Sequence, residues 1–218
     1  MALISGEGIA IDNLIGPSDA ILFHAYPGGT GGTAIAESLF GMHNRFGRLT
    51  MTWGPKAYED AVDFSDFSFA SAGRSYRYLQ ETPLFSFGEG LSFSDHTLTA
   101  TALPMGEGCA MAYEVAVRTT AGEKTGDVVV LAFLEPESVT GLATGTPLPK
   151  RMLVGATRVA KGAEGGAKLV VTLDAAAAQL TDLDGSRALR AGSYSVVFSS
   201  GVASAEVSLP LEIPAGCD

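Results

Sequence analysis

Short apolar runs separated by glycine and proline dominate the first 45 residues and indicate an α/β arrangement. Residues 2–5 and 20–25 are two such runs, and their continuity predicts strands of a parallel sheet that are buried on both faces. One strand–turn–helix unit cannot cover both faces of its strands, because parallel sheets carry helices on each side. The pattern therefore predicts that this segment is the end of a larger domain whose beginning is missing.

The second apolar run leads into a glycine-rich turn and then a short helix. Residues 27–32 read PGGTGG, which predicts a turn with backbone angles that favour glycine. In residues 33–40, Ile35 and Leu39 lie four apart and share one face of a helix. Gly41 follows directly and predicts the C-terminal end of that helix.

From Leu91 onward the period of the pattern changes from helical spacing to two. In residues 111–119, alternate positions carry Met111, Tyr113 and Val115, which predicts a strand with one buried face. Further β-rich runs, separated by turn signals, occupy residues 127–134, 153–159, 168–173, 193–198 and 203–211. About seven short strands over about 120 residues are typical of an antiparallel sandwich of the immunoglobulin or fibronectin type III kind.

Three irregular segments complete the pattern. Asp184-Gly185 lies between two apolar stretches and predicts a tight hairpin. Residues 135–150 contain three prolines and predict a long surface loop. Residues 46–90 are rich in aromatic residues and glycine with little periodicity, which indicates an extended connector packed on both neighbours.

Composition and charge exclude several classes of partner. The 218 residues carry a net charge of −10 and contain no cluster of Lys or Arg, so neither a nucleic acid nor an anionic membrane surface is an expected partner. No apolar stretch approaches the roughly 20 residues that a membrane-spanning helix needs. Residues 1–16 contain no basic residue, so no secretory signal is recognised. A neutral ligand such as a sugar is compatible with this composition.

The two cysteines, Cys109 and Cys217, allow one disulfide, but spacing alone cannot show that they pair. Since the chain has no dense cysteine framework, we expect one buried thiol and one tail thiol. His24, His43 and His96 are scattered without the spacing of metal ligands, and His24 is expected to be a satisfied core residue. We therefore expect neither a metal site nor another cofactor.

Four phrases follow one another along the chain: residues 26–41 (YPGGTGGTAIAESLFG), 47–53 (GRLTMTW), 73–78 (GRSYRY) and 83–93 (PLFSFGEGLSF). In this order they resemble the phrases of family 3 glycoside hydrolases of the β-xylosidase/β-glucosidase type. Their wording is closest to the plant-type β-xylosidase branch. The β-rich part is similar, more faintly, to the fibronectin type III-like domain that ends these enzymes.

The resemblance implies an α+β chain in three parts. Residues 1–45 would be the C-terminal remnant of an α/β sandwich domain, residues 46–90 the connector, and residues 91–218 a fibronectin type III-like β-sandwich. The substrates of the full-length relatives would be β-linked xylosides or glucosides. Relatives are commonly secreted, but without a signal peptide the localisation of this chain stays undetermined.

The resemblance also implies that no catalytic residue lies in this chain. Retaining glycosidases need a nucleophilic carboxylate and a general acid/base about 5 Å apart. In the family the nucleophile lies in a barrel domain, which is absent here, and the acid/base lies upstream of residues 2–5. Glu7 is expected to be a solvated loop carboxylate. The chain alone would therefore be an inert fragment, and whether it works as an enzyme is left open.

Three residues are candidates for a place near the substrate: Tyr26, Arg74 and Tyr76. The alternative is that Arg74, Tyr76 and their neighbours Arg77 and Tyr78 form a clasp of cation–π contacts and hydrogen bonds that holds the connector to both neighbours. Alternation in an extended segment would place Tyr76 and Tyr78 on one face. Trp53 is expected to be a buried anchor rather than a platform for sugar stacking.

Two other roles remain open. The chain could be a non-catalytic module that binds a polysaccharide or a protein, although the sandwich offers only Tyr113 and Tyr194 as large stacking residues. The uncovered sheet of residues 2–5 and 20–25 would also expose an apolar edge, which predicts self-association.

Overall fold

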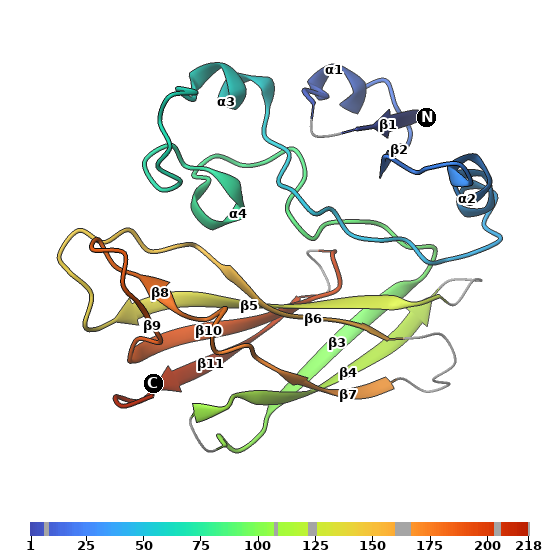
Figure 1. The fold of residues 1–218 in the computed structure, drawn as a ribbon. Coiled ribbons are helices and arrows are strands. Elements are labelled where there is room, and N and C mark those ends of the chain that lie inside the picture. Colours follow the sequence, from blue (N-terminus) through green and yellow to red (C-terminus); the bar gives the residue numbers. More distant parts are fainter. Residues whose placement is uncertain (7–8, 107–108, 122–125, 160–166, 203–205, 218) are drawn as a thin grey trace.

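The computed structural model describes residues 1–6, 9–106, 109–121, 126–159, 167–202 and 206–217. Figure 1 shows a β-sandwich in its lower half and, above it, a layer of short helices, loops and a two-stranded sheet formed by the first 90 residues. The longest helix of the described part, α2, has nine residues, so none of its helices could cross a membrane.

The N-terminal segment contains the predicted parallel strand pair and helix. Strand β1 (Ala2–Ser5) pairs in parallel with β2 (Ile21–Ala25), and the short helix α1 (Asp12–Ile15) lies between them in the chain. Helix α2 (Gly31–Leu39) begins two residues before the predicted start. It ends as predicted, because Gly41 has a positive φ of 65° and its N–H donates to the Ser38 carbonyl at 3.1 Å.

The two strands are not buried on both faces, contrary to the sequence prediction. Only Ile4 of β1 is buried, and Leu3 is 50% exposed. Among the described residues β1 and β2 have only each other as sheet neighbours, so the outer edges of the pair are not covered by further strands. A small core of Ile4, Ile11 and Trp53 forms on one face of the pair.

The connector is compact and carries helices α3 (Lys56–Ala61) and α4 (Ser75–Tyr78). Its centre is Trp53, which forms an isolated antiparallel bridge with Phe85. The Trp53 indole is 5% exposed, donates from Nε1 to the Ile9 carbonyl at 2.8 Å and meets Phe23 edge to face at 5.0 Å. Trp53 is therefore a buried anchor between the connector and the N-terminal segment.

Two antiparallel sheets form the sandwich. One has the strand order β11-β10-β5-β6 and the other the order β3-β4-β7. Their bounds are β3 (Asp95–Ala102), β4 (Ala112–Ala121), β5 (Val128–Val139), β6 (Met152–Val159), β7 (Ala167–Thr172), β10 (Gly192–Ser199) and β11 (Glu206–Ile213). The predicted hairpin at Asp184-Gly185 joins β8 (Leu180–Thr181) to β9 (Arg187–Ala188).

The period-two pattern explains the main core. Met111, Tyr113, Val115 and Val117 are all less than 5% exposed and point between the sheets, as their alternation predicts. Tyr113 meets Phe198 of the opposite sheet at a ring distance of 5.3 Å. All the buried residues of this core lie between Leu98 and Cys217, so the two sheets form it without residues of the first 90.

Strand β5 and strand β3 differ from the prediction. Residues 135–139 continue β5 rather than opening a loop, and Pro136 lies next to a register shift of the β5–β10 pair, a kind of position at which strands accept proline. Strand β3 was not predicted, because Leu98 is the only large apolar residue among the positions that alternate with its threonines.

The expectation of unpaired thiols is wrong. Cys109 and Cys217 form a disulfide with their Cα atoms 5.5 Å apart, and both pack against the main core. The pair is separated by 108 residues, so only the return of the C-terminal segment to the start of β4 brings the two cysteines together.

Candidate functional site

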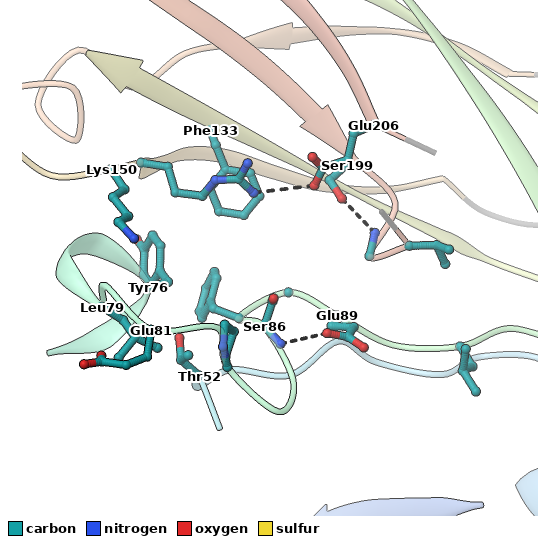
Figure 2. Close-up of a pocket in the computed structure, with 17 residues that line it drawn as sticks. Thr52, Tyr76, Leu79, Glu81, Ser86, Glu89, Phe133, Lys150, Ser199 and Glu206 are labelled. Atoms are coloured by element: carbon teal, nitrogen blue, oxygen red, sulfur yellow. Dashed lines mark hydrogen bonds and ion pairs between the residues drawn. The ribbon is translucent and has the colours of Figure 1, made fainter. Parts of the chain in front are cut away.

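An open cleft of about 470 Å³ lies between the connector and the four-stranded sheet. Figure 2 shows its two walls: the connector contributes Tyr76, Leu79, Ser86 and Glu89, and the sandwich contributes Phe133, Lys150, Ser199 and Glu206. The walls are far apart in sequence, so the cleft exists only because the connector lies across the outer face of the sheet.

An aromatic stack forms the apolar part of the cleft. The ring of Tyr76 stacks on Phe87 with centroids 4.3 Å apart, and both rings meet Phe133 edge to face at 6.1 Å. The Tyr76 hydroxyl accepts the Leu153 N–H at 3.1 Å. Tyr76 therefore fixes the connector to strand β6, and its two ring contacts leave little aromatic surface for stacking a sugar.

The charged side chains of the cleft are mostly paired with one another. Arg151 lies over the Phe133 ring at 4.9 Å, donates to the Glu135 carboxylate at 2.6 Å and reaches Glu206 at 3.5 Å. The Glu89 carboxylate accepts the Ser86 N–H at 2.7 Å. Within the described residues, Lys150 and Glu81 make no ion pair, and Figure 2 shows the Lys150 side chain reaching toward Tyr76.

The sequence missed Phe133, Arg151 and Glu206 as residues of this cleft. Residues 128–134, which read VVVLAFL, did contain an indication that the outer face of this strand is covered. In an antiparallel sandwich a strand with one solvated face should alternate, so a continuous apolar run indicates that a further layer covers the outer face. Leu131, Phe133 and Val197 form this outer cluster beneath the connector, separate from the main core.

The three predicted site residues lie in different surroundings. Tyr26 follows β2 and is 77% exposed. Arg74 donates from Nη2 to the main-chain carbonyls of Asp63, at 3.0 Å, and Asp66. Tyr76 lines the cleft, and no contact between Tyr26 and either of the other two is recorded in the part of the chain that the structure describes.

The predicted alternation of Tyr76 and Tyr78 is wrong, because residues 75–78 form the helical turn α4. This helical turn nevertheless makes hydrogen bonds and a cation–π contact, which are the two kinds of contact expected of the clasp. The Arg77 carbonyl accepts the Lys150 N–H at 2.6 Å, and the Arg77 guanidinium lies 5.9 Å from the centre of the Tyr78 ring. The contacts of Tyr76 and Arg77 both run to the sandwich.

The connector carboxyl groups whose pKa departs from the usual value do not have the properties of a general acid. Hydrogen bonds from Ser65 lower the pKa of Asp63, and hydrogen bonds from Ser68 and Ser71 lower the pKa of Asp66. A general acid instead needs a raised pKa. Glu7 lies outside the described residues.

The histidines have separate surroundings. His96 has a lowered pKa, chiefly because it is partly buried. His24 is not the satisfied core residue that was expected, since its Nδ1 is buried without a hydrogen-bond partner. The described residues contain no group of three or more potential metal ligands.

The fold of the chain is similar to part of several solved β-glucosidase structures. A β-glucosidase of Streptomyces venezuelae superimposes with a TM-score of 0.77 and 24% identity over 97% of this chain and 28% of its own. A family 3 β-glucosidase of Bifidobacterium adolescentis superimposes with a TM-score of 0.78 and 20% identity over 96% of this chain and 32% of its own. At these identities the likeness concerns the fold alone.

Sequence comparison identifies the family. Residues 1–93 match the family model of the glycosyl hydrolase family 3 C-terminal domain. A β-xylosidase/α-L-arabinofuranosidase of Medicago sativa subsp. varia is 38% identical over 102 residues, which cover 43% of this chain and 13% of the relative. A probable exo-1,4-β-xylosidase of Aspergillus flavus is 27% identical over 217 residues, which cover 84% of this chain and 26% of the relative.

Residues 1–93 thus match glycosyl hydrolase family 3 in the region of its C-terminal domain, and the relatives found by sequence and by structure are β-xylosidases and β-glucosidases. The resemblance inferred from the four phrases is thereby confirmed. The chain spans between about one eighth and one third of the length of these relatives.

Proposed function

We propose that the chain is the C-terminal region of a β-glycosidase that hydrolyses O-glycosyl bonds of β-linked xylosides or glucosides from plant-type polysaccharides and oligosaccharides. The observation that carries this proposal is the family match over residues 1–93, which includes all four phrases. The names of the relatives, β-xylosidases among them, support xylosides as the first substrates to test.

In this proposal the fragment is inactive by itself, because the nucleophile and the general acid/base belong to other parts of the enzyme. The purified chain should not release nitrophenol from aryl β-xyloside or aryl β-glucoside above the uncatalysed rate. Glu7→Gln should leave that result unchanged. Turnover by the chain that Glu7→Gln abolishes would contradict the proposal.

We also propose that residues 91–218 are a fibronectin type III-like domain. Two features support this assignment: sheets of four and three strands, and the hydroxyl of Tyr194, which donates to the Arg190 carbonyl at 2.7 Å. A tyrosine at the start of a strand that bonds the backbone a few residues upstream is the tyrosine corner of such sandwiches. Residues 1–45 and 46–90 are then the remnant of the α/β sandwich domain and the connector.

Within the proposed enzyme, Tyr26 is the candidate for direct substrate contact, because its ring is exposed at the carboxyl end of β2. Arg74 and Tyr76 would act by positioning the connector, since their polar groups are engaged with backbone groups. In a complete relative, a Tyr→Phe change at the position of Tyr26 should raise KM for aryl β-xyloside. An unchanged KM would argue against the contact.

The open strand pair β1–β2 supports a proposal of self-association. Leu3 of β1 is 50% exposed, and an uncovered apolar edge favours pairing with another chain. Light scattering should report oligomers for the full chain and a monomer for a fragment that begins at Met42. Equal monomeric masses for both would argue against association through the strand pair.

The alternative of a carbohydrate-binding module gains no support from Tyr113 and Tyr194. Both side chains are at most 2% exposed, so neither can stack on a sugar.

A further inference from the structure

Strand β3 begins where the connector enters the sandwich (Figure 1), and His96 is the second residue of this strand. His96 pairs across the sheet with Thr119 of β4. Because side chains alternate along a strand, the imidazole lies on the same face as the buried Leu98, which is the inner face of the sandwich. His96 is therefore a titratable group at the end of the sandwich interior, next to the connector.

Hydrogen bonds attach the connector to the sandwich at this end. The Arg48 Nε donates to the Ser200 carbonyl at 2.6 Å. The Asn44 side chain is buried, and its Oδ1 accepts the Phe93 N–H at 3.2 Å. We call these contacts of residues 44–48 the connector joint.

The hydrogen bonding of His96 suits a neutral imidazole. Its Nδ1 lies 3.3 Å from the Thr119 hydroxyl, whereas its Nε2 is buried and has no hydrogen-bond partner among the described residues. A neutral imidazole has one N–H group, but a protonated imidazole has two, and each of them needs an acceptor. Protonation would thus leave a buried donor at Nε2 without an acceptor, which is unfavourable.

The charges around His96 also favour the neutral form. Burial lowers the pKa of His96 most, Arg48 of the connector joint lowers it further, and Asp95 opposes them to a smaller extent. Arg48 is itself close to a second guanidinium, because the charge of Arg158 lowers the pKa of Arg48. A proton on His96 would therefore add a third positive charge to this end of the sandwich.

The other charged side chains of the neighbouring elements act elsewhere. The Asp127 carboxylate lies 3.6 Å from the Arg158 guanidinium. Of the elements that pack along β3, β10 carries no charged residue. The charged residues of β4, of β11 and of the connector beside the joint, none of which shifts the pKa of His96 within the described residues, are Glu114, Arg118, Glu206, Glu212, Arg45 and Glu89.

We propose that His96 is a pH switch: when its imidazole takes up a proton, the connector joint opens while the sandwich stays folded. The charged imidazole needs water at Nε2 and a greater distance from Arg48, and movement of residues 44–48 away from the sandwich supplies both. The main core stays intact, since its buried residues all lie between Leu98 and Cys217.

Opening of the connector joint would also change the cleft. Leu91 and Gly201 line one end of the cleft. The Arg48 Nη1 donates to the Leu91 carbonyl at 3.4 Å, and Gly201 lies directly against the Arg48 side chain. The protonation state of His96 thus acts on the cleft through Arg48. This inference does not depend on the proposed function.

The direction of the pH dependence follows from the lowered pKa of His96. A solvent-exposed histidine titrates near pH 6.5, and the closed joint holds the pKa of His96 below that value. The closed state therefore binds the proton less tightly than the open state. The contribution of neutral His96 to closure is complete above about pH 6.5 and is lost as the pH falls below it.

The test measures amide hydrogen exchange of the full 218-residue chain by mass spectrometry, at about pH 7.5 and about pH 5, with rates corrected for the intrinsic effect of pH. Peptides that cover residues 44–49 report the connector joint, and peptides that cover residues 128–134 report the sandwich. The switch variant is His96→Gln, which keeps a polar side chain but cannot take up a proton. The matched control is His43→Gln, which removes an exposed histidine that pairs with Glu37 at 3.3 Å.

We expect acidification to raise the opening constant of residues 44–49 several-fold in the unchanged chain. His43→Gln should show the same rise, and His96→Gln should show little or none. Residues 128–134 should keep their protection at both pH values in all three proteins, because opening is confined to the connector joint.

Two exchange results would overturn the switch. One is an equal rise in the unchanged chain and in His96→Gln, which would mean that another group senses the proton. The other is a simultaneous loss of protection in residues 44–49 and 128–134, which would mean that acid destabilises the whole sandwich. An NMR titration of the unchanged chain provides a test that needs no variant. The His96 ring should titrate below pH 6.5, and a midpoint at or above about pH 6.5 would also contradict the proposal.

Discussion

The Nε atom of Arg48 donates to the main-chain carbonyl of Ser200 at 2.6 Å, and thereby joins the connector to the turn between β10 and β11. Burial lowers the pKa of Arg48, as does the nearby charge of Arg158 to a smaller extent. Next to this bond, Gly201 approaches so closely that a Cβ would meet the Arg48 Nε at 2.2 Å. The contact therefore requires both a guanidinium at position 48 and no side chain at position 201.

Gly201→Ala should lower the free energy of unfolding much more than Gly185→Ala. Both glycines have a positive φ, 89° and 84°, so both variants incur a backbone strain of about 1–2 kcal/mol. Only Gly201→Ala also displaces Arg48, which adds about 1.5–3 kcal/mol for a lost charged hydrogen bond. Urea unfolding curves of the two variants measure the difference, and equal midpoints would show that the Arg48 contact contributes nothing.

Reduction of the Cys109–Cys217 disulfide should destabilise the sandwich strongly. A cross-link across 108 residues restricts the unfolded chain by about 4–5 kcal/mol in the chain-entropy model. We expect the midpoint of urea unfolding to fall when a reducing agent is added. The matched control is Cys109→Ser/Cys217→Ser, whose midpoint should already be low and should not respond to the reductant.

Tyr194→Phe should destabilise the chain by about 1–2 kcal/mol at neutral pH, because the Arg190 carbonyl loses its hydrogen bond. Tyr26→Phe is the control, since the exposed Tyr26 side chain should contribute little. An equal effect of the two substitutions would contradict a structural role for the Tyr194 hydroxyl.

The same residue predicts a dependence on alkaline pH. Burial raises the pKa of Tyr194 to about 12, whereas an unfolded tyrosine titrates near pH 10. The folded state therefore holds the proton more tightly, so its contribution to stability is complete below about pH 10 and is lost as the pH rises toward about 12. The free energy of unfolding of the unchanged chain should fall over this pH range, and the free energy of unfolding of the Tyr194→Phe variant should fall less.

A fragment of residues 91–218 should unfold cooperatively, because the buried residues of the main core all lie between Leu98 and Cys217. The same fragment should expose the outer cluster, since Phe133 loses its cover of Tyr76 and Phe87. We expect it to bind a hydrophobic dye and to associate. Phe133→Ser in the fragment should reduce both effects, whereas Val170→Ser, on an exposed side chain, should leave them unchanged. A fragment without a cooperative transition would contradict the proposed boundary at residue 91.

Local chemistry allowed several elements to be predicted from the sequence. The end of α2 follows from Gly41, the β8–β9 hairpin from Asp184-Gly185, and the inward face of β4 from the alternation of Met111, Tyr113 and Val115. Each of these depends on residues that are close in sequence, so the backbone preference and the period of burial are visible in the chain itself. The family was also recognisable, because four phrases keep their wording and order.

The tertiary structure decided what depends on distant segments. The Cys109–Cys217 disulfide and the cleft between Tyr76 and Phe133 join parts of the chain that no local pattern relates. Residues 64–69 looked like irregular connector in the sequence, and only the structure shows that Phe64, Phe67 and Phe69 are exposed there. Sequence by itself thus determined which faces of the strands are apolar, since side-chain direction follows the local backbone. Only the packing of the connector across the sandwich decided which of those faces are covered, because coverage depends on contacts between segments that are far apart in the chain.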